Sequence, residues 1–218
     1  MLMTNKFILT PRKALKKAYL KIKPHRDEIE DFKKYLLQLI DNINEAESEE
    51  HHKNLVRDFL KATYYKQDYF INTKDRKDMV IHKGKTADTP VTVIIETKKP
   101  TNKYEMPTKD DLNVKAFHEL LLYYLDERVD LNNNNITHLI ISNINEWFIF
   151  DSHVFEKHFY HSKSLLTKYR EFKNKQLTGT TTDFFYNDIA KVFIAGLTEE
   201  LEFTYFSLKD YEKPLRNN

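Results

Sequence analysis

Residues 78–100 read DMVIHKGKTADTPVTVIIETKKP. This stretch contains two short apolar runs, residues 79–81 and 91–95, on either side of a polar segment rich in turn-forming residues. β-Branched residues in both runs are typical of strands, and the segment between them is typical of a turn, so the stretch predicts an antiparallel hairpin. An acid precedes the first run, and an acid-x-lysine triplet ends the second.

The register of this hairpin brings three charged residues together. If the turn centres on Ala87, Asp78 is paired with Glu96. Side chains alternate between the two faces of a strand, so Glu96 and Lys98 point the same way. Directly paired side chains lie about 5 Å apart. We therefore expect Asp78, Glu96 and Lys98 to converge, with the backbone carbonyl of Thr97 nearby.

Two carboxylates and a lysine in this arrangement suit a metal-dependent nuclease. Mg²⁺ prefers oxygen ligands, keeps several waters and takes one or two carboxylates. Asp78, Glu96 and the Thr97 carbonyl are the predicted ligands, with Mn²⁺ as a possible substitute, and Lys98 is predicted to lie beside the water that attacks a phosphodiester. The alternative is a solvated hairpin whose lysine and acids form weak cross-strand ion pairs.

The composition excludes several other classes of site. The chain of 218 residues has a net charge of +2, three glycines and no cysteine. The lack of cysteine excludes a disulfide framework, a thiolate zinc site and a cysteine nucleophile. Neither of the Gly-rich phosphate-binding motifs occurs. No apolar run approaches the roughly 18 residues of a membrane span, and no signal peptide is visible, so we expect a cytoplasmic protein with no membrane partner.

Basic residues gather at the N-terminus, where residues 1–26 contain eight Lys or Arg residues and no acid. A basic arm of this kind can lie along nucleic-acid phosphates. Alternatively, residues 11–23 form a basic amphipathic helix that packs Leu15, Tyr19 and Ile22 inward and leaves its lysines in solvent. The two interpretations are compatible.

The hydrophobic pattern predicts alternating helices and strands. Helices are expected over residues 11–23, 25–45, 48–61 and 109–129, with further helical segments over 152–175 and 183–195. Besides the hairpin, strands are expected over residues 64–72, 136–142, 147–150 and 202–206. This order predicts an α/β fold in which helices flank a mixed sheet of about five strands. It divides the chain into an N-terminal helical arm (1–46), a nuclease core (47–165) and a C-terminal helical segment (166–218) that packs on the core or leads out of it.

The helix expected from Ser48 carries Glu47, Glu49 and Glu50 around its first turn. Glu49 or Glu50 could reach the predicted metal as an additional carboxylate. The alternative is that these acids only stabilise the N-terminus of the helix through its dipole.

The helix expected over residues 109–129 carries Asp111, Lys115 and His118 along one polar stripe. If this helix packs behind the hairpin, Lys115 or His118 could bind phosphate or orient the attacking water. The alternative is an ordinary solvated face.

Three other patterns have simpler explanations. His118-Glu119 begins a zinc-protease motif, but Leu122 stands where the second histidine would be. His158 and His161 are expected to be surface histidines, because no further ligands accompany them. The polar segment before Asp183 is expected to cap a helix, although it could also contact phosphate.

Longer stretches of the chain resemble the N-terminal nuclease region of type IIG restriction enzymes, which fuse a PD-(D/E)xK nuclease to an adenine methyltransferase. These stretches run almost from end to end of the chain: FILTPRKAL (7–15), NLVRDFLKATYY (54–65), IIETKKPTNK (94–103), NVKAF (113–117), NINEWFIFD (143–151), GTTTDFF (179–185) and DYEKPLRN (210–217).

The resemblance implies a restriction-endonuclease-like core with an N-terminal helical extension. It implies that Asp78 is the metal-bridging aspartate, that Glu96 is the second carboxylate and that Lys98 orients or activates the water. Glu49 or Glu50 would be the early-helix glutamate, and His118 occupies the position where related nucleases often have glutamine. Weaker candidates for nucleic-acid contacts are Lys99, Lys103 and Lys115.

The chain departs from the family in that Lys77 replaces the proline before Asp78, and in that no methyltransferase motif or target-recognition region is present. The expected function is a Mg²⁺-dependent endodeoxyribonuclease acting on double-stranded DNA. It would work with a methyltransferase and target-recognition region in the same or another chain, and as a transient homodimer when both strands are cut. The alternatives are a catalytically silent DNA-docking or assembly module, and a nuclease acting on RNA or structured DNA.

Overall fold

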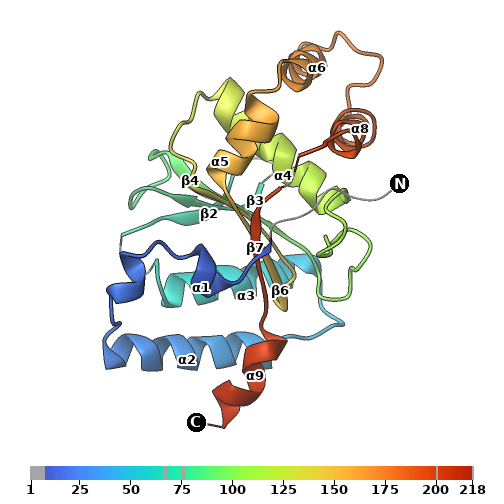
Figure 1. Cartoon of the computed structure of the whole chain (residues 1–218). Coiled ribbons are helices and arrows are strands. Elements are labelled where there is room, and N and C mark those ends of the chain that lie inside the picture. Colours follow the sequence, from blue (N-terminus) through green and yellow to red (C-terminus); the bar gives the residue numbers. More distant parts are fainter. Residues whose placement is uncertain (1–7, 66–67, 75–76, 200, 218) are drawn as a thin grey trace.

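A mixed sheet of seven strands lies at the centre of the protein (Figure 1). The computed structural model describes residues 8–65, 68–74, 77–199 and 201–217. Within these residues the strand order across the sheet is β1-β7-β6-β5-β4-β3-β2. The strand bounds are β1 Ile8–Leu9, β2 Ile71–Lys74, β3 Lys77–His82, β4 Val91–Thr97, β5 His138–Ser142, β6 Glu146–Asp151 and β7 Phe203–Ser207.

The predicted α/β class and mixed sheet are confirmed, but the predicted size of about five strands is wrong. β4 runs parallel to β5, and β1 runs parallel to β7, while the other neighbours are antiparallel. β1 was not predicted, because two residues are too few to show an alternating pattern. β7 comes from the segment 166–218, which therefore contributes a strand as well as helices.

The hairpin of β3 and β4 has the register that the turn predicts. Met79 pairs with Ile95, and Val80 pairs with Ile94. Continuing this register by one residue places Asp78 opposite Glu96. The register shifts only at the turn end of the hairpin, between Ile81 and His82.

Helices cover both faces of the sheet, as Figure 1 shows. One face carries α4 and the helices from α5 to α8, and the other carries α1, α2, α3 and α9. The α-helix bounds are α1 Pro11–Ala14, α2 Arg26–Asp41, α3 Glu49–Ala62, α4 Lys115–Leu125, α5 Ser152–Phe155, α6 Lys163–Lys173, α7 Thr182–Phe184, α8 Lys191–Ala195 and α9 Lys209–Arg216. Shorter helical turns are η1 Tyr19–Lys21 (3₁₀) and the π-helical η2 Asp126–Asp130, η3 Glu156–Tyr160 and η4 Phe185–Ala190.

The N-terminal helix expected over residues 11–23 is interrupted. Leu15 takes an extended conformation that ends α1. The three apolar side chains expected to pack inward are exposed, at 50% for Leu15, 61% for Tyr19 and 63% for Ile22. The predicted inward packing is therefore wrong, and without such packing a short helix is only marginally stable. Lys6, the first of the basic residues, lies outside the described residues, as do residues 66 and 67 of the strand expected over 64–72.

The helix expected over residues 109–129 begins later than predicted, at Lys115. The Thr108 hydroxyl accepts from the Asp111 N–H at 2.9 Å, and the Asp111 carboxylate accepts from the Asn113 N–H at 2.8 Å. Such side-chain bonds compete with helical backbone bonds, which explains why Asp111 is not part of the helix. The polar stripe predicted from Asp111 through His118 therefore does not exist as one helical face.

The sheet separates two hydrophobic cores. Val80 and Ile94 belong to the core under α4, whereas Met79 and Ile95 belong to the core under α2 and α3. The alternation of faces places Glu96 on the α4 side, two residues from Ile94, and Asp78 lies at the same end of the sheet, two residues from Val80. None of the helices among the described residues has the length and apolar character required to cross a membrane.

Candidate active site

Lys98 lies at the centre of a group of acidic side chains that converge from four parts of the chain. Its side chain is only 4% exposed. Its Nζ lies 2.7 Å from a carboxylate oxygen of Glu96 and 2.7 Å from one of Glu119. Glu105 at 3.6 Å and Glu49 at 3.9 Å are further carboxylates around the same ammonium. We call these five residues, together with Asp78, the Lys98 cluster.

Asp78 is held rigidly at the rim of the Lys98 cluster. Its Oδ2 accepts hydrogen bonds from the Thr97 backbone N–H at 3.0 Å and from the Thr97 hydroxyl at 2.9 Å. Its Oδ1 lies 3.8 Å from the ammonium of Lys53 on α3. The side chain remains 22% exposed. Thr97, whose carbonyl is a predicted metal ligand, positions the neighbouring carboxylate through its N–H and hydroxyl.

At both Glu96 and Lys98, burial and the charge of the other residue shift the pKa in opposite directions. Burial raises the pKa of Glu96 well above its usual range; Lys98 works against this shift, and Asp78 and Glu119 add to it. Burial by itself lowers the pKa of Lys98, but the carboxylates of Glu96 and Glu119 outweigh it, so the net pKa is raised. Lys98 therefore stays protonated at neutral pH.

Two buried oxygens in the Lys98 cluster have incomplete bonding. Oε2 of Glu96 has no hydrogen-bond partner. Oε2 of Glu119 also has no hydrogen-bond partner. The ammonium of Lys98 lies 2.7 Å from it, and this contact is an ion pair without hydrogen-bond geometry. A buried carboxylate oxygen without a donor is costly unless a cation or proton completes it.

The donor chemistry of Asp78 and Glu96 fits Mg²⁺. No group of three or more His, Asp or Glu side chains in the described ranges is arranged to hold a metal ion. A Mg²⁺ ion that keeps several waters requires only one or two carboxylates, together with substrate oxygens. The unpartnered oxygen of Glu96, with Asp78 on the paired strand, offers two such carboxylates.

The structure distinguishes between the two candidate early-helix glutamates. Ser48 caps α3, as predicted, by accepting from the His51 N–H at 3.1 Å. Glu49 turns toward the Lys98 cluster and accepts from the Lys99 N–H at 3.2 Å. Glu50 instead pairs with Lys53 and is 60% exposed. Glu49 is therefore the early-helix glutamate that joins the site.

On α4, Glu119 joins the site and His118 does not. Nε2 of His118 bonds to the Asn113 side-chain oxygen at 2.7 Å, and no described contact links His118 to Lys98 or its carboxylates. Sequence reasoning missed Glu119 because it considered that residue only within a zinc-protease motif. The available signal was an acid inside an otherwise apolar helix, since a glutamate is rarely buried without a partner.

His118 should make the fold less stable in acid without affecting catalysis. Burial lowers the pKa of His118 from 6.5 to about 4. Below pH 6.5 the unfolded chain therefore binds a proton that the folded chain does not, so stability is lost as pH falls toward 4. This shift is worth about 3 kcal/mol when complete. We expect His118→Gln to remove that part of the pH dependence, as measured by urea unfolding at pH 7 and pH 4.5; an unchanged pH dependence would contradict the prediction.

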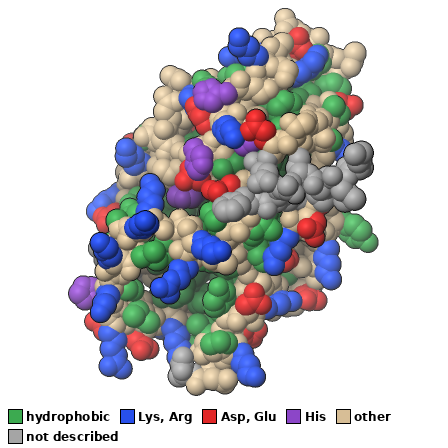
Figure 2. Space-filling view, in the orientation of Figure 1, with side chains coloured by type: hydrophobic (Ala, Val, Ile, Leu, Met, Phe, Trp, Pro, Cys, Tyr) green, Lys and Arg blue, Asp and Glu red, His purple; other side chains and the backbone are tan. Residues whose placement is uncertain are grey.

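The three lysines proposed from the sequence to contact nucleic acid differ in their surroundings. Lys115 is tied to Glu105 at 2.8 Å and lies 3.8 Å from Glu119. Lys99 is half-buried, and Lys103 is exposed. Other Lys and Arg side chains lie over the layer that contains α1 and α2, on the face drawn in Figure 2. Lys103 is the exposed lysine of the three whose ammonium has no described carboxylate partner.

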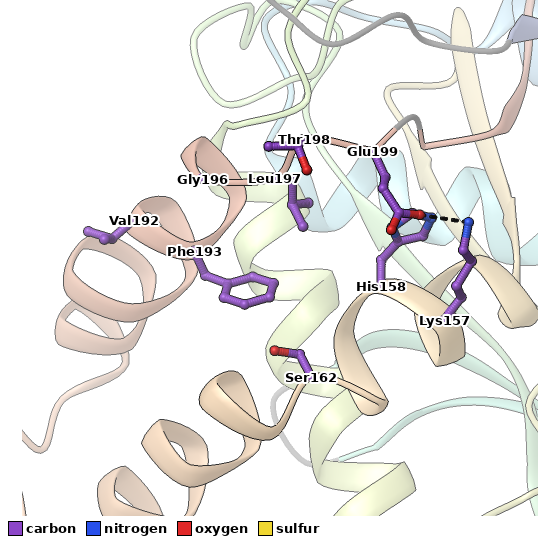
Figure 3. A pocket seen from close by; sticks show the side chains of 9 residues that line it. All are labelled: Lys157, His158, Ser162, Val192, Phe193, Gly196, Leu197, Thr198 and Glu199. Atoms are coloured by element: carbon purple, nitrogen blue, oxygen red, sulfur yellow. Dashed lines mark ion pairs between the residues drawn. The ribbon is translucent and has the colours of Figure 1, made fainter.

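A separate hollow of about 420 Å³ lies between the η3 turn and α8. Figure 3 shows Lys157 and Glu199 closing one side as an ion pair of 2.8 Å, with Phe193 on the opposite wall. His158, expected at the surface, is buried here, and burial lowers its pKa. None of the lining residues takes part in the described ion pairs of Lys98.

Comparison with known proteins gives one match. No curated protein and no solved structure matches the chain. One family model matches residues 9–218, which is nearly the whole chain and includes every residue of the Lys98 cluster. The chain belongs to the family described as a domain of unknown function (DUF7149).

Proposed function

We propose that this chain is a Mg²⁺-dependent endodeoxyribonuclease that hydrolyses phosphodiester bonds in double-stranded DNA. The observation that carries the proposal is the buried ammonium of Lys98, held 2.7 Å from Glu96 with Asp78 on the paired strand. Burying such charges together stabilises a fold little or not at all compared with apolar residues. Strongly perturbed charged groups at one place are typical of sites that carry out chemistry.

Asp78 and Glu96 would hold the Mg²⁺ ion. When bound, Mg²⁺ polarises the phosphate and lowers the pKa of a coordinated water. Lys98 places positive charge where the pentavalent phosphorus gathers negative charge. Because the pKa of Lys98 is raised, it acts as a hydrogen-bond donor that orients the water and not as a general base. Glu119 holds the ammonium in place.

Access and architecture support the proposal. Asp78 and Glu49, with side chains 22% and 43% exposed, form the open side by which a phosphate can approach. The mixed sheet with helices on both faces is compatible with a restriction-endonuclease-like core. We further propose that a methyltransferase and a target-recognition region act with this domain, and that two copies pair transiently to cut both strands.

Cleavage of a supercoiled plasmid with Mg²⁺ tests the proposal. Asp78→Asn and Glu96→Gln should each reduce the rate at least about 100-fold, since each replaces a charged oxygen ligand at the reacting phosphate. Glu49→Gln should lower the rate by about 10- to 100-fold, because it orients other groups at the site. Glu50→Gln is the matched control, one residue away and directed to solvent, and should cleave like the parent protein.

Two outcomes would overturn the proposal. Parental rates in Asp78→Asn and Glu96→Gln would show that the reaction does not depend on these carboxylates. Absence of cleavage with any divalent metal, together with salt-dependent DNA binding that survives both substitutions, would favour the docking module. Parallel assays on RNA, single-stranded DNA and duplex DNA identify the substrate.

A further inference from the structure

A hollow of about 570 Å³ is lined by close sequence neighbours of the Lys98 cluster, among them Pro100, two residues after Lys98, and Met106, directly after Glu105. Residues from three connections line it: 100–110 after β4, 143–146 between β5 and β6, and 205–209 at the end of β7. β5 is parallel to β4 and, like β7, antiparallel to β6, so the carboxyl ends of β4, β5 and β7 meet at one edge of the sheet. Lys98 itself belongs to this edge, because its N–H donates to the Ser142 carbonyl at 2.9 Å.

The hollow carries a surplus of positive charge. Lys103, Lys109 and Lys209 line it, and none of them forms an ion pair with a described carboxylate. The two acids in the lining are Asp110 and Glu146. Three ammonium groups against two carboxylates leave a net charge of +1.

Contacts within the hollow engage Glu146 and leave Lys109 without a described carboxylate partner. Glu146 is engaged by the Tyr205 hydroxyl, which donates to it at 2.9 Å. The ammonium of Lys109 lies 4.3 Å from the centre of the Tyr205 ring, an arrangement that holds the charge over the hollow without neutralising it. Lys209 begins α9, whose first turn also carries Asp210 and Glu212, so the positive charge that faces the hollow comes from its lysines and not from the end of this helix.

The neighbouring active site has the opposite charge. The Lys98 cluster contains five carboxylates (Glu49, Asp78, Glu96, Glu105 and Glu119), whereas Lys53 and Lys115 at its margins bring the ammonium groups to only three. A DNA strand, with a negative charge on every phosphate, needs positive charge near this point to approach it.

We propose that this hollow binds a backbone phosphate of the same DNA strand, next to the phosphodiester that is cut. This inference rests on the nuclease proposal and adds a site that positions the substrate. Lys103, Lys109 and Lys209 are its phosphate ligands, and the amide of Asn145 is a further donor. The amide of Asn143 already donates to Glu146 at 3.4 Å. The volume lies in the range of sites that hold a small ligand and exceeds what a lone phosphate needs, so the sugar attached to the phosphate also fits.

The test compares two triple variants of the full chain that lose the same charge. The first is Lys103→Gln/Lys109→Gln/Lys209→Gln. The control is Lys61→Gln/Lys163→Gln/Lys213→Gln, which removes three exposed lysines outside the hollow. DNA binding is measured by fluorescence anisotropy with Ca²⁺ in place of Mg²⁺, on duplexes of two unrelated sequences and over a range of salt concentrations. Circular dichroism and thermal unfolding establish that both variants are folded.

The hollow variant should bind about tenfold more weakly, equally for both sequences, and its salt slope should fall by roughly one unit, because one phosphate loses its contacts. Its cleavage should show a raised KM with kcat within about threefold of the parent. Equal weakening in the control variant, or no DNA binding by the parent protein, would overturn the proposal. If no variant cleaves DNA but the binding difference persists, the phosphate site stands while the nuclease proposal fails.

Discussion

Replacing Lys98 with methionine should abolish Mg²⁺-dependent cleavage and lower the free energy of unfolding by about 3–5 kcal/mol. The side chains of Lys98 and Glu96 are 4% and 2% exposed, so water cannot replace the lost ammonium. Methionine keeps the length and apolar stem of lysine, and it therefore isolates the charge from the packing. Urea unfolding and plasmid cleavage measure the two effects.

The stability deficit of Lys98→Met should depend on pH in a defined direction. Without the ammonium, the folded-state pKa of Glu96 rises further, because Lys98 is the group that opposes the effect of burial. An acid whose pKa is raised by folding contributes stability that is present below its unfolded value and is lost as pH rises through its folded value. The deficit should therefore be larger at pH 8 than at pH 5.

Lys115→Met is the control for this experiment. Lys115 contacts Glu119, as Lys98 does, but its side chain is 45% exposed. Ion pairs exposed to this degree contribute about 1 kcal/mol or less. A deficit in Lys98→Met as small as that of Lys115→Met, or one that does not change with pH, would show that the buried charges are not coupled as described.

Replacing Glu127 with alanine should destabilise the fold by about 3 kcal/mol. Glu127 is 1% exposed and accepts from Lys74 at 2.9 Å and from Asn133 at 3.0 Å. Its Oε1 also lies 3.3 Å from the ammonium of Lys77, the residue that replaces the proline expected before Asp78. The substitution removes an acceptor from three buried or half-buried donors at once.

A surface pair provides a matched comparison for Glu127→Ala. Lys85 and Asp68 are also 3.3 Å apart, but their side chains are 69% and 75% exposed. Asp68→Ala should change stability by no more than about 0.5 kcal/mol. Since the two pairs share a distance and differ in burial, equal effects in thermal or urea unfolding would refute the role given to burial.

Lowering the pH should reduce the stability that Glu127 contributes to the fold. Burial by itself raises its pKa, but the hydrogen bonds from Lys74 and Asn133 outweigh burial and lower it. A carboxyl whose pKa is lowered by folding contributes stability above its unfolded value, near 4.5, and loses it as pH falls through the folded value. The difference between the parent protein and Glu127→Ala should therefore shrink below about pH 4.5.

Some helices and the hairpin could be predicted because their signals are local. Ser48 before two acids identifies the start of α3, and the turn between the apolar runs determines how β3 pairs with β4. The start of α4 was predicted too early because the side chains of Thr108 and Asp111 bond to nearby backbone groups. A helical pattern does not reveal such competition.

Residue types could not identify which polar side chains of a helix reach the site. His118 and Glu119 are neighbours on α4, yet only Glu119 contacts Lys98. The difference depends on how α4 is rotated about its axis when it packs on the sheet. That rotation follows from the apolar contacts of the whole helix, because almost every residue of α4 is buried.

The proximity of Asp78, Glu96 and Lys98 follows from local patterns, because strand alternation and turn length set the register over about twenty residues. The packing of the whole chain brings Glu49 and Glu119 to Lys98, and it gathers Lys103, Lys109 and Lys209 around one hollow. These groups come from segments far apart in the chain. Their meeting depends on how helices and connections pack at the edge of the sheet, and no local pattern specifies that packing.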